Sequence, residues 1–364
     1  MKVSVILGTR PELIKMQPVI REILDRSSFE FVFVHTGQHY DWNMSSVFIE
    51  ELELPEPDMF LNVKSGSQGS QTARIIARSE KVLKKERPDV ILVQGDTNSA
   101  LGAAIAASKL KLKIGHVEAG CRSFDKDMPE EINRVLIADL ASFDFAPTRT
   151  CVENLLREGV EESQIHLTGH PIVDILIRIG DKITIDVLEK LALRPKEYYF
   201  VTVHREENVE NRIKLGNMLE ALSAVARSRP MVFPMHPHTH KSVRKFGVKS
   251  SLKNVSIIEP LGYLETLSLI KHARIVLTDS GGIQQEAALL GTPCVTLRAR
   301  TEWVETVDCG VNFLADSKED IIATVSSVES RYEKILKRFD SAHNIFGEPH
   351  VAARIVDVLE ASDG

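Results

Sequence analysis

Cysteine is scarce in this sequence, and its placement is informative. The four cysteines among 364 residues, Cys121, Cys151, Cys294 and Cys309, form no CxxC pair. Widely spaced cysteines fit neither a disulfide framework nor a zinc knuckle, so we predict a reducing, cytoplasmic location. Positive charge is not in excess either, since 45 Lys and Arg stand against 51 Asp and Glu and give a formal charge of −6. This balance excludes a general attraction to nucleic acid or anionic lipid, so any bound phosphate must be held by a local site.

Long apolar runs are absent as well. The apolar start at residues 3–7 is followed directly by Gly8, Thr9 and Arg10, which makes it too short for a signal peptide. No run approaches the ~18 apolar residues of a membrane-spanning helix, and we expect a soluble protein. Hydrophobic residues make up 43% and charged residues 26% of the chain, a globular balance that excludes disorder and coiled coil. At roughly 150 residues per domain, the length allows two domains.

The chain also lacks the GxGxxG fingerprint of dinucleotide-binding proteins and the Walker A loop of ATPases. The dehydrogenase and ATPase interpretations therefore lose their main support, and we predict no cofactor. His236, His238 and His240 alternate, but the residues between them interrupt regular structure. We predict no metal site, because metal ligands must converge and be supported by further hydrogen bonds.

What the sequence does contain is an alternation of short β-rich apolar runs with helical patterns. The runs cover residues 2–7, 31–36, 90–94, 113–117 and 143–146, and after Gly169 they cover 198–203, 231–235, 255–258, 275–278 and 294–297. Repeated βα units predict a parallel sheet with helices on both faces. We therefore predict an α/β protein with two Rossmann-like parallel-sheet domains that face a cleft. The expected domains are residues 1–170 and 171–348, followed by an amphipathic helix at 349–364 that packs back on the first domain.

Ligands of open α/β sheets bind at the carboxyl ends of the strands, so the residues after each strand are the candidates. After the first strand, Thr9 and Glu12 fit a capping box, while Arg10 and Lys15 flank a helix N-terminus and favour an anion site. A plain capped helix with two solvated cations would give the same pattern.

A second candidate for phosphate binding lies in the other half. Gly281 and Gly282 carry no Cβ, so backbone N–H groups can approach a phosphate, and Ser280 adds a hydroxyl donor. Glu286, one turn later, is placed to accept both hydroxyls of a ribose. The alternative is a tight strand-to-helix turn with a surface glutamate.

Acid and base candidates follow other strands. Asp96 and Glu118 each close a predicted strand, and Glu130 opens a helix. Carboxylates around one cleft can have divergent pKa values, which leaves one as an acid and another as a base. The structural alternatives are a helix N-cap for Asp96 and a dipole partner for Glu130. In the second half His204 ends a strand beside Arg205, which makes it a catalytic candidate.

In their order and spacing these segments resemble the non-hydrolysing UDP-N-acetylglucosamine 2-epimerases, a family of two-lobed GT-B architecture. The resemblance spans nearly the whole chain and rests on residues 8–15, 94–97, 115–120, 129–134, 203–208 and 278–286. It implies inversion at carbon 2 of a UDP-2-acetamido sugar, from UDP-N-acetylglucosamine to UDP-N-acetylmannosamine. The carbon 2 proton is removed, UDP is eliminated to give a glycal, and UDP adds back after reprotonation on the other face.

The resemblance also implies roles for individual residues. The family's catalytic positions match Asp96, Glu118, Glu130 and His204. Its substrate-binding positions match Arg10 and Lys15 on the phosphate side, Arg205, the UDP-binding turn Ser280, Gly281 and Gly282, then Glu286 and Arg298. The first domain should thus carry the acid/base carboxylates and the second should bind UDP. A second substrate molecule that acts as an activator would bind Gln38, Gln71, Glu207 and His236 together with Arg205, although ordinary cleft-lining residues would look the same.

The sequence departs from the family pattern at three places. Gly169-His170-Pro171 replaces Gly-Asn-Thr, Trp303-Val304 replaces Arg-Pro, and Cys121 stands where Leu is usual. The Trp303-Val304 form looks more like epimerases of UDP-2,3-diacetamido uronic acids. In that hypothesis Trp303 faces an extra acetamido methyl, while His170 and Arg300 meet the sugar carboxylate. The alternative is that Trp303 packs its own loop.

Other functions remain open at this point. They are a hydrolysing 2-epimerase, a retaining UDP-sugar glycosyltransferase and a non-catalytic nucleotide-sugar sensor. The expected partners are the UDP-sugar, UDP and a second copy of the chain in a homodimer, with no nucleic acid and no membrane.

Overall fold

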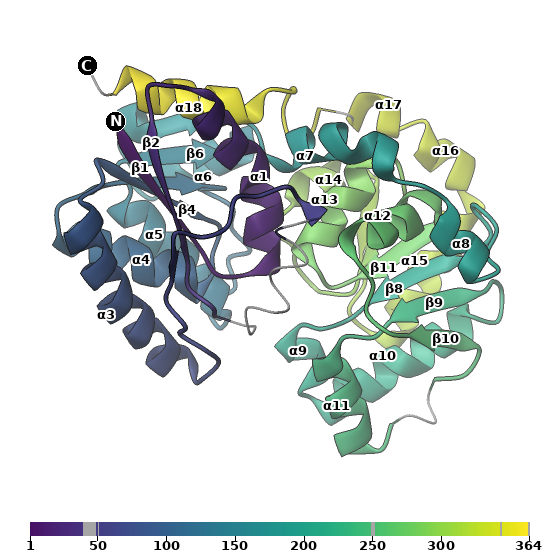
Figure 1. Ribbon diagram of the computed structural model, residues 1–364. Helices are drawn as coiled ribbons and strands as arrows, with labels where there is room; N and C mark the ends of the chain where they lie inside the picture. Colours follow the sequence, from purple (N-terminus) through teal and green to yellow (C-terminus); the bar gives the residue numbers. More distant parts are fainter. Residues whose placement is uncertain (39–48, 50, 249–251, 343, 363–364) are drawn as a thin grey trace. The chain divides into compact units, whose positions relative to one another are not determined.

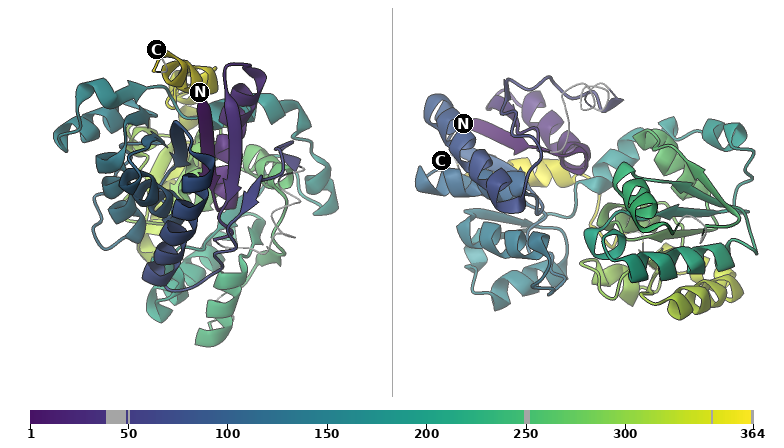
Figure 2. Two further views of the ribbon diagram at one scale, coloured as in Figure 1. Left: turned by 60° about the vertical axis from the view of Figure 1, so that its left-hand side comes forward. Right: turned by 90° about the horizontal axis from the view of Figure 1, so that it is seen from below.

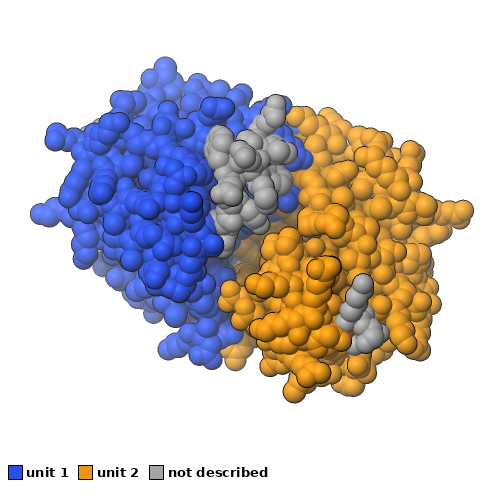
Figure 3. Space-filling view, turned by 60° about the horizontal axis from the view of Figure 1, so that its bottom comes forward, with its two compact units in different colours: residues 1–178, 346–364 blue, residues 179–345 orange. Residues whose placement is uncertain are grey.

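The computed structural model describes residues 1–38, 49, 51–248, 252–342 and 344–362. The chain forms two compact units, coloured separately in Figure 3. Unit 1 consists of Met1–Arg178 and Phe346–Gly364, and unit 2 consists of Ile179–Ile345. The division therefore falls in the last turn of helix α7 (Ile172–Ile179), whereas the sequence suggested a boundary before this helix.

Unit 1 is built on a seven-stranded parallel sheet in the order β3-β2-β1-β4-β5-β6-β7 (Figure 1). The strands are β1 (Lys2–Leu7), β2 (Glu30–His35), β3 (Met59–Phe60), β4 (Val90–Gln94), β5 (Lys113–Val117), β6 (Phe143–Ala146) and β7 (Ile165–Leu167). Five of the six residues of β1 and all five of β4 are buried. Continuous apolar strands of this kind are expected where helices cover both faces of a sheet.

The helices of unit 1 are α1 (Arg10–Asp25), α3 (Gln68–Glu86), α4 (Asn98–Lys109), α5 (Pro129–Leu140), α6 (Arg149–Arg157), α7 and α18 (Val351–Ala361). The alanine-rich α4 packs against both α3 and α5, because small side chains allow close approach on two sides. The C-terminal helix α18 packs against α1 (Figures 1 and 2). Arg26 joins the two through Asp357 and Glu360, at 2.7 and 2.9 Å.

Unit 2 repeats the same plan with six parallel strands in the order β10-β9-β8-β11-β12-β13. The strands are β8 (Tyr199–Thr202), β9 (Met231–Pro234), β10 (Val255–Ile258), β11 (Ile275–Thr278), β12 (Cys294–Thr296) and β13 (Asn312–Leu314). The helices are α8 (Asp186–Lys190), α9 (Glu206–Val209), α10 (Arg212–Val225), α11 (Pro237–Phe246), α12 (Tyr263–His272), α13 (Gly281–Leu289), α14 (Val304–Asp308), α15 (Lys318–Ser330), α16 (Tyr332–Leu336) and α17 (Phe339–Ala342).

The predicted fold class, two Rossmann-like parallel-sheet units, is confirmed. If the strands are numbered within each unit, both sheets contain the order 3-2-1-4-5-6, and unit 1 adds a seventh strand at the end. In this order the chain first builds the sheet in one direction and then, from the fourth strand on, in the other. All ten predicted strands are present, with ends that differ by a residue or so, while the short strands β3, β7 and β13 were not predicted. No helix in the described part of the chain is long and apolar enough to cross a membrane.

The strand order tells where a ligand should bind. Open α/β sheets bind ligands at the carboxyl ends of strands beside the point of reversal. In unit 1 that point lies between β1 and β4, and in unit 2 between β8 and β11. The candidate residues Arg10 and Asp96 follow β1 and β4, and His204 and Ser280 follow β8 and β11.

Candidate active site

The carboxylate of Glu118 is the best-defined feature of the unit 1 site. It follows β5 and is 8% exposed. Its Oε2 accepts hydrogen bonds from Lys15 Nζ at 2.6 Å, from His170 Nε2 at 2.9 Å and from Gln94 Nε2. Its backbone has a φ of 70°, which is unusual for a residue with a side chain and is typical of functional sites.

These contacts fix the charge of Glu118. Burial by itself would raise the pKa of the carboxyl, but the charge of Lys15 and the hydrogen bonds from Lys15 and His170 lower it to about 2. Burial opposes the charge of Lys15 too, yet the attraction of Glu118 raises the pKa of that ammonium group. At neutral pH the two therefore form a charged pair.

Asp96 lies in a different setting. Its Oδ2 pairs with Arg134 Nη2, and its backbone carbonyl accepts from Asn133 Nδ2 at 2.8 Å. The side chain is 23% exposed, against 9% for that of Glu118. Asp96 is not a helix N-cap, because Thr97 takes that role for α4 by accepting from the N–H of Ala100. The more accessible of the two carboxylates is thus held by Arg134 of α5, while Asn133 of the same helix holds the Asp96 backbone.

The two acidic residues at the start of α5 differ in role. Glu131 is buried and accepts from the backbone N–H groups of Ser123 and Phe124, and it pairs with Arg134 at 2.8 Å. Glu131 thus fixes the loop before α5 and the arginine that holds Asp96. Glu130, the predicted catalytic residue, is only partly buried on the first turn of the helix.

Glu12 is a fully buried carboxyl that ties two of the candidate loops together. It accepts from the N–H of Gly8 at 2.9 Å and from the hydroxyl of Thr97 at 2.7 Å, so it joins the turn after β1 to the turn that carries Asp96. The predicted capping box is only half present, because the Thr9 side chain makes no cap hydrogen bond. Burial raises the pKa of Glu12 to about 7, despite the hydrogen bonds that favour its charged form.

A pH-dependent stability follows from Glu12. The pKa of an ordinary glutamate is 4.5, so the folded protein binds a proton more tightly here than the unfolded chain does. The resulting stability is fully present below pH 4.5 and is lost as the pH rises through 7. Because one pKa unit equals about 1.4 kcal/mol, the loss between pH 5 and pH 8 should be about 2.5 kcal/mol. Glu12→Gln should remove this loss, measured by urea unfolding at both pH values.

The control for this prediction is Glu56→Gln, which changes a carboxylate at an exposed position. Its stability relative to the unmodified protein should be the same at pH 5 and pH 8. If Glu12→Gln shows the same pH-independent difference, the burial of a titrating Glu12 carboxyl is refuted.

In unit 2 a buried carboxylate, Asp279, organises the turn after β8. Asp279 is fully buried at the end of β11 and accepts from the backbone N–H groups of His204 and Arg205, at 3.1 and 3.0 Å. Asn208 adds a side-chain hydrogen bond at 3.0 Å. His204 Nδ1 lies 3.3 Å from Asp279 Oδ1, and the His204 side chain is 41% exposed. A carboxylate beside Nδ1 orients an imidazole. Asp279 therefore belongs to the candidate site, although the sequence analysis gave it no role.

The turn from Ser280 to Gly282 opens α13, as predicted. A Cβ on Gly281 would lie 2.3 Å from Glu302 Oε1, so a larger residue there would displace the Glu302 side chain. A Cβ on Gly282 would meet only Ser280 Oγ at 3.9 Å, so that position is open toward its surroundings. The helix N-terminus therefore offers N–H groups that an anion can reach, and Glu286 is buried one turn further in.

A network of charges lies beside this turn. Arg298 is buried and pairs with Glu302 at 2.8 Å and with Glu207 at 3.2 Å, and Arg205 lies 3.5 Å from Glu302. Arg298 and Arg205 are thus already balanced by carboxylates on the same unit. A diphosphate near them would compete with Glu302 for the same cations.

Two residues of the uronate hypothesis are not placed as it requires. Trp303 is 1% exposed, with its backbone N–H bonded to Thr301, so it packs its own loop and presents no surface to a sugar. His170 is fully buried and hydrogen bonded to Glu118, so it cannot meet a sugar carboxylate. Arg300 alone is exposed.

The predicted activator residues fall on both units. Gln38 and Gln71 are each 4% exposed in unit 1. Gln38 Oε1 accepts from Ser99 N at 2.8 Å, and Gln71 Nε2 donates to the Gln38 carbonyl at 2.9 Å. Glu207 and His236 are exposed in unit 2. The two glutamines therefore have internal structural roles, and an activator role for these four residues stays a prediction.

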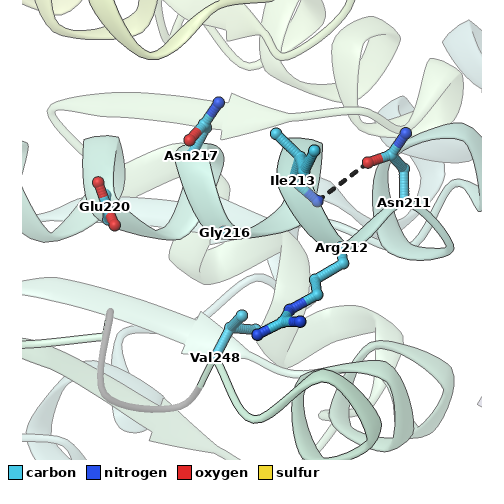
Figure 4. Close-up of a pocket in the computed structure, with 7 residues that line it drawn as sticks. All are labelled: Asn211, Arg212, Ile213, Gly216, Asn217, Glu220 and Val248. Carbon is cyan, nitrogen blue, oxygen red and sulfur yellow. Dashed lines mark hydrogen bonds between the residues drawn. The ribbon is translucent and has the colours of Figure 1, made fainter.

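One surface cavity lies away from all of these residues. It has a volume of about 710 Å³ in unit 2 and is lined by Asn211, Arg212, Ile213, Gly216, Asn217, Glu220 and Val248 (Figure 4). Asn211 is the N-cap of α10, and Figure 4 shows its side chain accepting a hydrogen bond from the N–H of Ile213. None of the predicted site residues lines this cavity.

The fold and the site together define a class of protein. Two Rossmann-like units of GT-B type, with paired carboxylates after β4 and β5 and a glycine turn opening α13, are the architecture of enzymes that act on nucleotide sugars. Residues 21–360 match the sequence family described as UDP-N-acetylglucosamine 2-epimerase. The chain belongs to this family.

Individual relatives agree. The chain is 46% identical to a UDP-N-acetylglucosamine 2-epimerase of Methanococcus maripaludis, over 98% of both chains. It is 39% identical to a UDP-2,3-diacetamido-2,3-dideoxy-D-glucuronate 2-epimerase of Pseudomonas aeruginosa, over 99% of both. The crystal structure of the Methanocaldococcus jannaschii UDP-GlcNAc 2-epimerase in complex with UDP-GlcNAc and UDP matches with a TM-score of 0.88 and 43% identity, covering 99% of this chain and 100% of that one.

Proposed function

We propose that this enzyme interconverts UDP-N-acetylglucosamine and UDP-N-acetylmannosamine by eliminating UDP to a glycal and adding it back. The observation that carries the proposal is the pair of carboxylates at the carboxyl ends of β4 and β5, with Lys15 ion-paired to one of them. Membership of the 2-epimerase family supports the same reaction. A non-catalytic sensor would not need this arrangement of buried, charged groups.

The chemistry explains why cations are needed. The hydrogen on carbon 2 is not acidified by a carbonyl, so its removal must be coupled to departure of the diphosphate from carbon 1. Leaving UDP gains negative charge, which Arg10, Lys15 and a helix N-terminus can stabilise. We assign UDP to the turn Ser280–Gly282, with Glu286 on the ribose hydroxyls, and we assign sugar chemistry to unit 1.

The roles of the two carboxylates differ in this proposal. Glu118 stays ionised and holds Lys15, because its lowered pKa makes it a poor base. Asp96, the more exposed carboxylate, transfers the proton at carbon 2. Glu130 and His204 serve the opposite face of the sugar and the leaving group. This division explains why two carboxylates on neighbouring strands are kept in such different surroundings.

The unsubstituted acetamido sugar is favoured over the diacetamido uronate. The uronate hypothesis needed Trp303 and His170 to face the sugar, and both are buried. The Pseudomonas aeruginosa relative shows that this family also includes an enzyme named for that substrate. A direct comparison of kcat/KM for the two UDP-sugars decides between them.

The proposed route is tested by running the reaction in deuterated water. Substrate and epimer should both gain deuterium at carbon 2, while UDP remains bonded in both, because the proton leaves and returns through solvent-exchanging groups. Mass spectrometry and proton NMR measure the deuterium at carbon 2 and show whether UDP is still bonded to the sugar. Epimerisation that keeps the original hydrogen would rule out elimination, and stoichiometric free UDP with free sugar would identify a hydrolase.

We also propose a homodimer formed through α5. Ile132, Val135 and Leu136 are 50%, 42% and 45% exposed on this helix. Ile132 also lines a cavity of about 370 Å³, together with Ile76 and Pro129. A second copy of the chain would cover this apolar face. Sedimentation should give twice the chain mass of 40.6 kDa, and a monomer at micromolar concentration would contradict the proposal.

The four free cysteines support the cytoplasmic location that we propose.

A further inference from the structure

His170 contacts the buried carboxylate of Glu118 from the loop after β7. It follows β7, in a loop where Gly169 has a φ of 88°, and its side chain is completely buried. Its Nε2 lies 2.9 Å from Glu118 Oε2, across 52 residues of sequence. No other side chain of its loop reaches Glu118 among the contacts of the described residues.

The hydrogen bonds of the imidazole define its proton. Its Nδ1 accepts the backbone N–H of Ile172 at 3.0 Å, so Nδ1 carries no hydrogen. The proton must then be on Nε2, which donates it to Glu118. Burial lowers the pKa of His170, although Glu118 opposes this, and the ring is therefore neutral at neutral pH.

The ring is also held from its other side. The His170 backbone N–H donates to the carbonyl of Phe346 at 2.8 Å, and the two rings meet edge to face with centroids 6.1 Å apart. A Cβ on Gly347 would lie 2.8 Å from the Cα of Gly169, so the two chain segments pack directly on each other. The imidazole is thus fixed between Phe346 and Glu118.

We propose that His170 is a positioning residue for epimerisation: its Nε2–H fixes the Glu118 carboxylate, and Glu118 in turn holds the Lys15 ammonium that assists UDP departure. This inference rests on the proposed function of the site. Glu118 Oε2 takes donors from three directions, namely Lys15, Gln94 and His170. Without the imidazole, Oε2 would keep only the donors Lys15 and Gln94, and the carboxylate that holds Lys15 would be less firmly fixed.

The kinetic test compares two variants of similar volume. In His170→Gln the amide nitrogen can replace the Nε2–H, whereas His170→Met has no donor. We expect His170→Met to lower kcat about 10- to 100-fold, with KM and UDP affinity within about threefold of the unmodified enzyme. His170→Gln should recover most of that loss. His166→Met, in the neighbouring strand β7, is the matched control and should keep kcat within about twofold.

Unchanged kcat in His170→Met, or equal losses in the Met and Gln variants at equal thermal stability, would overturn the proposal. Selective 15N-histidine NMR of the unmodified protein tests the hydrogen bond from His170 to Glu118 directly. This test does not depend on the folding of a variant or on the proposed reaction. In the unmodified protein, His170 should show a proton on Nε2 and none on Nδ1 at pH 7. Changing Glu118→Gln should shift that Nε2–H signal. A proton on Nδ1 would refute the hydrogen bond itself.

Discussion

Asp96→Asn should lower kcat for epimerisation by about a thousandfold and leave the affinity for UDP unchanged. The expected size follows from general acid–base catalysis, which contributes typically 10²- to 10⁴-fold. Asn keeps the shape and an oxygen acceptor for Arg134, whose other amino group stays on Glu131. UDP binding should persist, because the proposed UDP contacts at Ser280–Gly282 belong to unit 2.

The measurement is a steady-state epimerase assay together with UDP titration by calorimetry. Deuterium exchange at carbon 2 should fall in parallel with kcat, since both need the same proton transfer. Asp127→Asn is the matched control, because it removes the same charge from an exposed position in the loop before α5. Its kcat should stay within about twofold. If the kcat of Asp96→Asn stays within tenfold of that of the unmodified enzyme, Asp96 is not the base and another residue must remove the proton.

The sequence predicted the fold well because the signal is local. Apolar runs of four to six residues followed by a helical pattern define each βα unit, and the helix N-termini at Arg10 and Gly281 were read from turn chemistry. The short edge strands β3, β7 and β13 were missed, since two or three residues carry no periodic pattern. Neither the strand order nor the extension of unit 1 through α7 can be derived from such local patterns.

The sequence predicted which candidate residues follow neighbouring strands, but not what each of them contacts. Arg10, Asp96 and Glu118 follow β1, β4 and β5, which are neighbours in the sheet, and Lys15 lies on the helix after β1. That Glu118 pairs with Lys15, and so stays ionised, depends on a contact across 103 residues of sequence. No local pattern encodes it.

For His170 and Trp303, the uronate hypothesis placed in contact with the sugar two side chains that are buried. Both were departures from a family pattern, and both were given contacts with the sugar in the uronate hypothesis. The structure places them in the interior, where His170 serves Glu118 and Trp303 packs its loop, the alternative that was kept open. A substitution in a motif indicates that the surroundings have changed, but only the fold shows whether the changed side chain faces a ligand or the core.

Gly120→Ala should destabilise unit 1 more than any surface substitution. Gly120 lies two residues after Glu118, with a φ of 79°. A Cβ there would lie 2.3 Å from the carbonyl oxygen of Cys151 and 2.9 Å from Leu155 Cγ. A left-handed backbone costs alanine about 1 kcal/mol, and displacing a buried backbone segment costs typically 1–3 kcal/mol more. We expect a total of about 3 kcal/mol, with loss of activity because the Glu118 loop must move.

Gly159→Ala separates the two contributions. Gly159 has a φ of 89°, close to that of Gly120, but a Cβ there would meet nothing within 4 Å. Its cost should therefore be only the backbone term of about 1 kcal/mol. In a unit of this size that lowers the thermal midpoint by roughly 2–4 °C, against roughly 6–12 °C for Gly120→Ala. Equal midpoints for the two variants would mean that α6 does not pack on the Glu118 loop, and the hydrogen bond from Asn154 Nδ2 to the Gly120 carbonyl at 3.0 Å would then also be in question.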